Sequence, residues 1–192
     1  DVGGFSGDPG PELFARWFEV GCYLPFFRGH ADFASPRKEP WAYGTDALER
    51  VRSALRWRMR MLPYLEARFR EASADGVPVV RPLFFAGPAD PRLREVDDAF
   101  LVGPDLLVVP ALEPDARARE VPLPPGRWRR VPVDALLAEP PPEASRERAL
   151  EGPDAQGSLH VEVGPGPAPC FLRVAGRLPL SLVRRLCPAD CA

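Results

Sequence analysis

Apolar residues at helical spacing indicate two helices in the first third of the chain. The first begins near residues 9–12, where proline and an acidic side chain favour a helix start. Its apolar positions have the period of one amphipathic helix: Leu13, Phe14, Trp17, Phe18 and Cys22. The second helix is predicted from about residue 46 to residue 74, and its apolar face comprises Leu48, Val51, Leu55, Met59, Leu62, Leu65 and Phe69. Pro63 lies inside it, so we expect a kink or two helices end to end.

Short apolar runs beside these helices predict strands. Residues 1–5 are strand-like and run into a glycine turn, and residues 23–27 are typical of a buried strand that ends at Arg28-Gly29-His30. The order strand, helix, strand, helix is the order of elements in the last two βα units of a (β/α)8 TIM barrel. In such barrels, polar residues at the carboxyl ends of the strands face the active site. We therefore expect Asp1 and His30 at that end.

The remainder of the chain is predicted to be all-β. Short apolar segments bounded by Gly, Pro or Asp occupy residues 79–85, 100–103, 106–112, 120–123, 127–131, 160–163 and 170–174. Several short strands with turn signals between them favour a β-sandwich. The 26 prolines are concentrated here, at a density that helices cannot absorb.

The predicted fold class is therefore α/β plus all-β, with the last βα units of a TIM barrel followed by a proximal β-sandwich domain. We expect the barrel part over residues 1–76 and the sandwich over residues 77–180. Residues 132–157 are acidic, proline-rich and weakly patterned, which favours a long surface insertion, partly disordered. Residues 181–192 form a tail outside both parts.

The composition argues against several classes of binding partner. The net charge of −2 and the pI near 5.8, with both signs interspersed, argue against a nucleic-acid or anionic-membrane partner. No apolar run approaches the roughly 20 residues of a membrane span. The four cysteines are scattered and the chain has two histidines, so we expect no metal site, no cofactor, and free thiols in a reducing compartment. Free thiols favour a cytoplasmic location.

Several longer motifs resemble one known family in their order and spacing. They include Asp1-Val-Gly-Gly-Phe5, Pro25-Phe26-Phe27-Arg28-Gly29-His30, Arg37-Lys38-Glu39-Pro40-Trp41, Leu62-Pro63-Tyr64-Leu65 and Leu123-Pro124-Pro125-Gly126-Arg127-Trp128. Over roughly the first 130 residues this series resembles glycoside hydrolase family 31, the α-glucosidase-like hydrolases. The resemblance fades in the acidic proline-rich stretch, returns at residues 168–176, and does not extend to residues 181–192.

The resemblance implies the C-terminal fragment of a retaining α-glycoside hydrolase of α-glucosidase or α-xylosidase type. Retaining enzymes use two carboxyl groups about 5–5.5 Å apart. In the family, both catalytic motifs precede the Asp-x-x-Gly-Phe element, and neither occurs in this chain. We therefore assign no catalytic residue here, expect the nucleophile and the acid/base upstream, and expect the chain alone to be inactive on an α-glucoside or α-xyloside.

The resemblance assigns three substrate-binding residues. Asp1 matches a carboxylate of the sugar subsite, although a strand-end acid bonded to backbone amides is the alternative. Phe5 matches an aromatic side chain beside the same pocket, with a plain core position as the alternative. His30 matches a histidine that donates a hydrogen bond to a sugar hydroxyl, against the alternative of a structural histidine. Arg28 is expected to support the pocket or to form a surface salt bridge.

Other conspicuous side chains receive structural assignments. Trp41 is expected to pack against the barrel rim rather than to stack on a sugar, and Glu39 to pair with Arg37 or Lys38. The carboxylate pair Asp97 and Asp98 is interpreted as structural, and His160 as exposed or in the core.

A second class of function remains open. The chain would then be a non-catalytic carbohydrate-binding or interaction β-module, and its strands should carry rows of exposed aromatic side chains. The phenylalanines of the predicted strands lie in apolar runs that favour a core position instead: Phe84, Phe85, Phe100 and Phe171.

Overall fold

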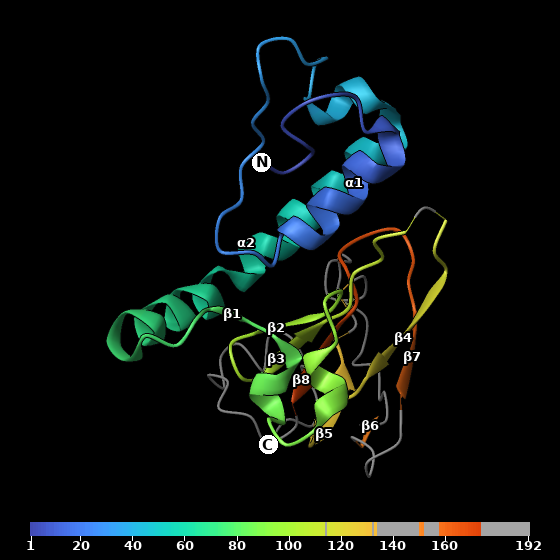
Figure 1. The fold of residues 1–192 in the computed structure, drawn as a ribbon. Helices are drawn as coiled ribbons and strands as arrows, with labels where there is room; N and C mark the ends of the chain where they lie inside the picture. The colour runs from blue at the N-terminus through green and yellow to red at the C-terminus, as the bar shows by residue number, and fades with distance from the viewer. Residues whose placement is uncertain (114, 132, 134–149, 152–157, 174–192) are drawn as a thin grey trace.

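The computed structural model describes residues 1–113, 115–131, 133, 150–151 and 158–173. Two long helices lie side by side, and a β-rich body lies below them in the view of Figure 1. The helices are α1 (Gly10–Gly21) and α2 (Gly44–Asp75), and a short 3-10 helix, η1 (Pro40–Tyr43), leads into α2. No helix in the described part of the chain is both long and apolar enough to span a membrane.

Both predicted helices are present. Pro9 at the N-cap and Glu12 in the first turn lie where the sequence placed the start of α1. The helix α2 continues through Pro63 as one element rather than two. Gly76 ends it in a left-handed conformation with φ +71°, and its amide donates to the carbonyl of Ala72 at 3.0 Å.

Most members of the predicted apolar face of α2 are exposed in this structure. Val51 and Leu65 are buried, but four of the predicted residues are exposed: Leu55, Met59, Leu62 and Phe69. The buried face comprises Ala47, Val51, Ala54, Trp57, Met61, Tyr64 and Leu65. Two residues of this set, Ala47 and Ala54, are small, so a pattern drawn through the largest apolar side chains overlooks them.

The predicted strand at residues 23–27 is wrong as well. The chain turns after α1, with the amides of Tyr23 and Leu24 donating to Val20 and Gly21 at 3.2 and 2.9 Å. Arg58 of α2 donates to the carbonyls of Cys22, Leu24 and Pro25 at 2.7–3.2 Å. This side chain therefore satisfies carbonyls that a strand would direct at a neighbouring strand. One rung of parallel pairing remains, between Val2 and Gly29.

Within the described residues, the β-rich part contains two antiparallel sheets. Strands β1 (Val80–Arg81), β2 (Phe100–Val102), β3 (Leu106–Val108), β8 (Cys170–Arg173), β5 (Arg127–Arg130) and β6 (Leu150–Glu151) form one sheet in this order. Strands β4 (Ala118–Pro122) and β7 (Ser158–Glu162) form the second. The predicted strand at residues 79–85 is shorter, because 3-10 turns η2 (Leu83–Ala86) and η3 (Pro91–Arg94) follow β1.

The large sheet separates two apolar cores. Leu106 and Val108 of β3 belong to the core beneath α1 and α2, whereas Leu107 and Val109 belong to the core shared with β4 and β7. This alternation is the signature of a sheet that is covered on both faces, as in the predicted sandwich. Most of the predicted insertion at 132–157, and the tail at 181–192, lie outside the described residues.

Three buried side chains join the helices to the sandwich. The hydroxyl of Tyr64 donates to the carbonyl of Val102 and that of Tyr23 to the carbonyl of Ala168, both at 2.6 Å. The carboxylate of Glu19 on α1 accepts a hydrogen bond from the amide of Gly166 at 2.7 Å. Helices and sandwich therefore form one packed unit in the described part of the chain.

Candidate functional site

Asp1 and His30 lie on two segments that are joined by one parallel rung. The amide of Val2 donates to the carbonyl of Arg28 at 2.9 Å, and Val2 pairs with Gly29. In this parallel register Asp1 lies beside Arg28, and His30 follows directly after the paired residue Gly29. We call Asp1, Phe5, Arg28 and His30 the strand-end cluster.

An ion pair joins the two segments within this cluster. The guanidinium of Arg28 lies 3.3–3.4 Å from one carboxylate oxygen of Asp1, and both side chains remain partly exposed. The hydrogen bond from the amide of Gly4 goes to the backbone carbonyl of Asp1 and not to its carboxylate. The carboxylate is thus held by the arginine at an open edge, where it can also accept hydrogen bonds from a ligand.

Phe5 and His30 form the second contact of the cluster. Their ring centroids are 5.6 Å apart with the planes tilted by 40°. Phe5 is 48% exposed, so the alternative of a plain core position is wrong, and His30 is exposed beside it. The imidazole can therefore donate to a ligand while one side of it rests on an aromatic ring.

The backbone beneath the cluster is held by the following loop. The amide of Asp32 and the hydroxyl of Ser35 donate to the carbonyl of Phe5 at 2.9 and 3.1 Å. Hydrogen bonds from Ser35 lower the pKa of the Asp32 carboxyl. On the other side of the turn, Lys38 donates to the carbonyl of Gly3 at 3.4 Å. Residues 1–5 are thus anchored from two directions.

The cluster offers a carboxylate, a guanidinium, an imidazole and an aromatic face at one open edge. These groups suit a small ligand that carries several hydroxyls on an apolar ring. The cluster contains one carboxylate, whereas retaining glycoside hydrolysis needs two.

Phe26 was missed as a rim residue because the sequence placed it in a buried strand. Its side chain is 68% exposed, and the guanidinium of Arg28 lies 5.3 Å from its ring centroid. The turn that Arg58 holds directs the segment away from a sheet. No local sequence signal identifies Arg58 as the partner of these carbonyls, because it lies more than 30 residues away.

Three other residues singled out in the sequence lie outside the strand-end cluster: Trp41, Glu39 and His160. Trp41 is 67% exposed, so the prediction that it packs against the rim is wrong in the described part of the chain. Glu39 approaches Arg37 at 4.0 Å, as predicted. His160 is exposed on β7 and faces Glu120 on β4.

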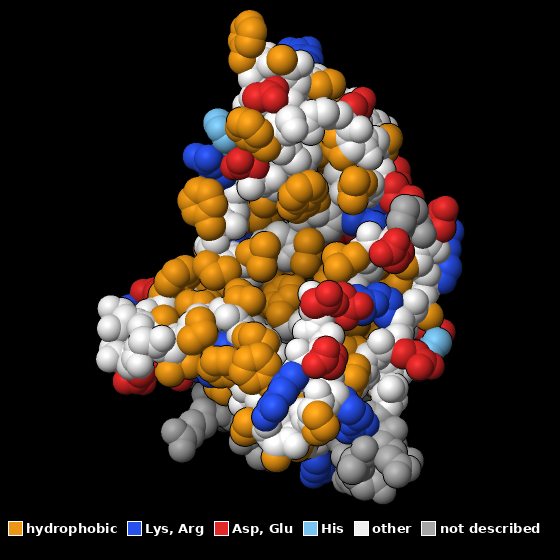
Figure 2. All heavy atoms as spheres, in the orientation of Figure 1, with side chains coloured by type: hydrophobic (Ala, Val, Ile, Leu, Met, Phe, Trp, Pro, Cys, Tyr) orange, Lys and Arg blue, Asp and Glu red, His pale blue; other side chains and the backbone are white. Residues whose placement is uncertain are grey.

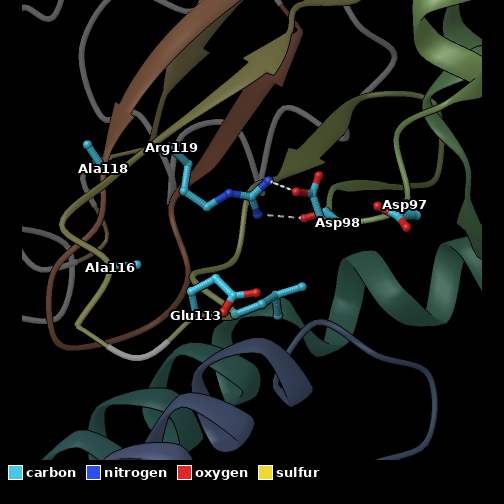
Figure 3. A pocket seen from close by; sticks show the side chains of 7 residues that line it. Asp97, Asp98, Glu113, Ala116, Ala118 and Arg119 are labelled. Carbon is cyan, nitrogen blue, oxygen red and sulfur yellow. Dashed lines mark hydrogen bonds and ion pairs between the residues drawn. The ribbon is translucent and has the colours of Figure 1, made fainter.

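Asp97 and Asp98 line a hollow of about 490 Å³ on the sandwich. Figure 3 shows the guanidinium of Arg119 directed at Asp98, which it contacts through both the carboxylate and the backbone carbonyl, while Asp97 points elsewhere. Arg119 donates a further hydrogen bond to the carbonyl of Pro110 at 2.6 Å. Asp98 therefore has the structural role that the sequence indicated, whereas Asp97 is exposed.

Two family models match this chain. "Glycosyl hydrolases family 31 TIM-barrel domain" matches residues 1–67, and "Glycosyl hydrolase family 31 C-terminal domain" matches residues 76–149. Together they span most of the chain, one over the helical part and one over the sandwich.

Curated relatives carry α-glucosidase names. A probable glucan 1,3-alpha-glucosidase of Arabidopsis thaliana is 51% identical over 108 residues, which are 56% of this chain and 12% of that protein. Neutral alpha-glucosidase C of Mus musculus is 42% identical over 124 residues, 65% of this chain and 14% of that protein. The chain thus spans less than one sixth of the length of either relative.

Solved structures share the fold over nearly the whole chain. A GH31 alpha-xylosidase from a soil metagenome, complexed with xylose, superposes with a TM-score of 0.77 at 29% identity, covering 97% of this chain and 28% of that one. A GH31 dextranase of Flavobacterium johnsoniae, complexed with glucose, superposes with a TM-score of 0.76 at 28% identity, covering 92% and 20%. Sequence and structure agree on the end of a TIM barrel followed by a β-sandwich, and the chain belongs to glycosyl hydrolase family 31.

Proposed function

We propose that this chain supplies part of the substrate-binding wall of a retaining α-glycoside hydrolase. The substrate is an α-glucoside or an α-xyloside, and the catalytic nucleophile and acid/base come from other parts of the whole protein. Asp1, Phe5 and His30 bind the sugar, and Arg28 orients the carboxylate of Asp1. The chain by itself is inactive, because one carboxylate at the site cannot perform a two-carboxylate mechanism.

The observation that carries this proposal is the strand-end cluster. Its two contacts, Asp1 with Arg28 and Phe5 with His30, link two segments that share one parallel rung. Barrel enzymes bind their substrates at the carboxyl ends of such strands. Hydroxyl groups of a pyranose can pair with the carboxylate and the imidazole, while its C–H face can rest on Phe5. The names of the relatives and the xylose and glucose complexes of the related structures fit this ligand class.

The exposed apolar side chains of α1 and α2 support the proposal that other barrel units pack against these helices in the whole protein. Figure 2 shows a broad apolar area across this face of the molecule. On α1 and α2 the exposed large side chains include Leu13, Trp17, Leu55, Met59, Leu62 and Phe69. Contiguous apolar surface of this kind marks a contact with other protein. In a closed barrel, neighbouring βα units cover the helices of each unit.

The alternative of a carbohydrate-binding β-module receives less support. Phe171 is buried in the sandwich core, and Phe100 and Phe84 pack against the cores from partly buried positions. Phe85 is exposed, but it lies in a 3-10 turn rather than in a strand. The described strands therefore carry no row of exposed aromatic side chains.

The two histidines of the chain provide a test with a matched control. In the full-length protein, His30→Ala should lower kcat/KM for α-glucosyl fluoride or an α-xyloside by about 10- to 100-fold, the loss expected for a hydrogen bond to a sugar hydroxyl. His160→Ala, at an exposed position on β7, should leave kcat/KM unchanged. Equal values for wild type and His30→Ala would remove His30 from the sugar site.

A further inference from the structure

Phe33 is the most exposed large apolar side chain in the described part of the chain. Its side chain has 104% of the reference exposure, and it follows His30 by three residues. Aromatic side chains gain the most from burial, so a phenylalanine held fully in water contributes nothing to folding within this unit. Its position beside the strand-end cluster therefore suggests a role in binding.

The turn that carries Phe33 is anchored on the cluster. The amide of Ser35 bonds to the carbonyl of Asp32 at 3.3 Å and closes the turn around residues 33–34. Both Asp32 and Ser35 also donate to the carbonyl of Phe5, at 2.9 and 3.1 Å. Phe5 in turn has its ring against His30. The backbone on either side of Phe33 is thus fixed to the residue that contacts the candidate sugar ligand.

The ring of Phe33 differs from the other aromatic rings at this edge. The ring of Phe5 lies against His30, and that of Phe26 lies under the guanidinium of Arg28. Within the described residues, Phe33 forms neither a ring–ring nor a cation–π contact. Its faces are available to a ligand.

We propose that Phe33 is a stacking platform for the sugar unit next to the one bound by Asp1 and His30. This inference rests on the proposed function and deepens it, because it makes the preferred substrate an oligosaccharide rather than a monosaccharide glycoside. A pyranose presents an apolar C–H face and a polar rim of hydroxyls. Phe33 offers an apolar face between polar neighbours, Asp32 on one side and Ser35, Arg37 and Lys38 on the other.

A sugar fits this position better than a protein partner does. Protein interfaces have contiguous apolar cores. The residues after Phe33 are Ala34, Ser35, Pro36 and Arg37, and the side chain of Arg37 is 84% exposed. An exposed aromatic ring with polar neighbours, next to groups that bind hydroxyls, is an arrangement that suits an oligosaccharide.

The test compares two substrates in the full-length protein. An α-glucosyl fluoride occupies the Asp1–His30 subsite alone, because its leaving group is a single atom. An α-linked glucose disaccharide or trisaccharide also reaches the next subsite. Phe33→Ala should lower kcat/KM for the oligosaccharide roughly 5- to 20-fold, as expected for the loss of one aromatic contact, and leave the fluoride unchanged. Phe33→Trp should retain oligosaccharide hydrolysis, and Phe85→Ala, an exposed phenylalanine on the sandwich, should affect neither substrate.

The outcomes separate this inference from the proposed function. If Phe33→Ala changes neither substrate, or lowers both equally, Phe33 is not a sugar platform. If His30→Ala still impairs the fluoride in that case, the proposed function stands without the platform. Loss of the His30 effect on the fluoride would overturn the proposed function itself. Melting temperatures of the variants show that folding is intact, as expected for a side chain without packing contacts.

Discussion

Glu19 offers a direct test of how the helices are joined to the sandwich. Its side chain is 4% exposed on α1. Arg50 of α2 donates to its two oxygens at 2.7 and 3.0 Å, and the amide of Gly166 donates at 2.7 Å. The backbone carbonyl of Glu19 also accepts a hydrogen bond from the amide of Ala168 at 3.1 Å. Glu19→Ala removes the carboxylate contacts and leaves the backbone contact.

The expected loss of stability depends on the charge of Arg50, which stays after Glu19 is removed. Breaking a buried ion pair by removing one partner costs about 3–5 kcal/mol, because the remaining charge is uncompensated. Arg50 keeps a second, solvent-exposed partner in Asp46 at 3.8 Å. We therefore expect the lower end of that range, about 3 kcal/mol, for Glu19→Ala. Glu19→Gln keeps the size and one acceptor oxygen, and should cost about 1–2 kcal/mol.

Hydrogen exchange of the full-length protein measures this loss where it occurs. A local destabilisation of about 3 kcal/mol speeds exchange roughly 100-fold, so peptides that contain Gly166 and Ala168 should exchange much faster in Glu19→Ala. The control is Glu66→Ala, which breaks an exposed pair with Arg70 at 2.6 Å on α2 and should cost less than about 1 kcal/mol. If the exchange of the Gly166 peptide is the same in both variants, Glu19 does not hold the sandwich to the helices.

Two further predictions follow from buried positions. Gly3→Ala should lower the free energy of unfolding by about 2–4 kcal/mol, since Gly3 has φ +87° and a Cβ would lie 2.6 Å from the Phe14 ring. The control is Gly7→Ala, where φ is +69° but an added Cβ would meet no atom, and it should lower the free energy of unfolding by only about 1–2 kcal/mol. Thermal unfolding measures both variants. Equal losses would contradict the close contact at Gly3. Burial raises the pKa of the Cys22 thiol well above its usual range, so at pH 8 it stays protonated. Mass spectrometry should show Cys22 unmodified by iodoacetamide in the folded protein and labelled in urea, whereas rapid labelling of the folded protein would refute the burial.

The sequence predicted the elements that depend on local or repetitive signals. Proline and an acid at its first turn defined α1. Strand-like segments at residues 1–5 and 23–30 indicated parallel pairing, of which one rung, between Val2 and Gly29, is present. The buried face of α2 could not be read from side-chain size, because two of its buried residues are the small side chains Ala47 and Ala54.

Contacts between residues far apart in the sequence have no local sequence signal from which they could be predicted. Glu19 and Gly166 are 147 positions apart, and neither residue type is diagnostic of a partner. The sequence also does not predict that Phe33 is exposed, because a phenylalanine in a loop can lie on the surface or fold back into a core. Its significance depends on the turn that fastens it to Phe5, which is a property of the folded chain.

The helix α2 determines which segments of this chain can be exchanged for those of a relative. Arg58 fixes the turn that leads to Arg28 and His30, and Tyr64, six residues later on the same helix, is bonded to β2. These two attachments are about 9 Å apart along one rigid element. A recombined chain that takes its final barrel unit from one parent and its sandwich from another would therefore disturb the position of His30. The last helix and the sandwich should be inherited, transplanted or redesigned as a single piece.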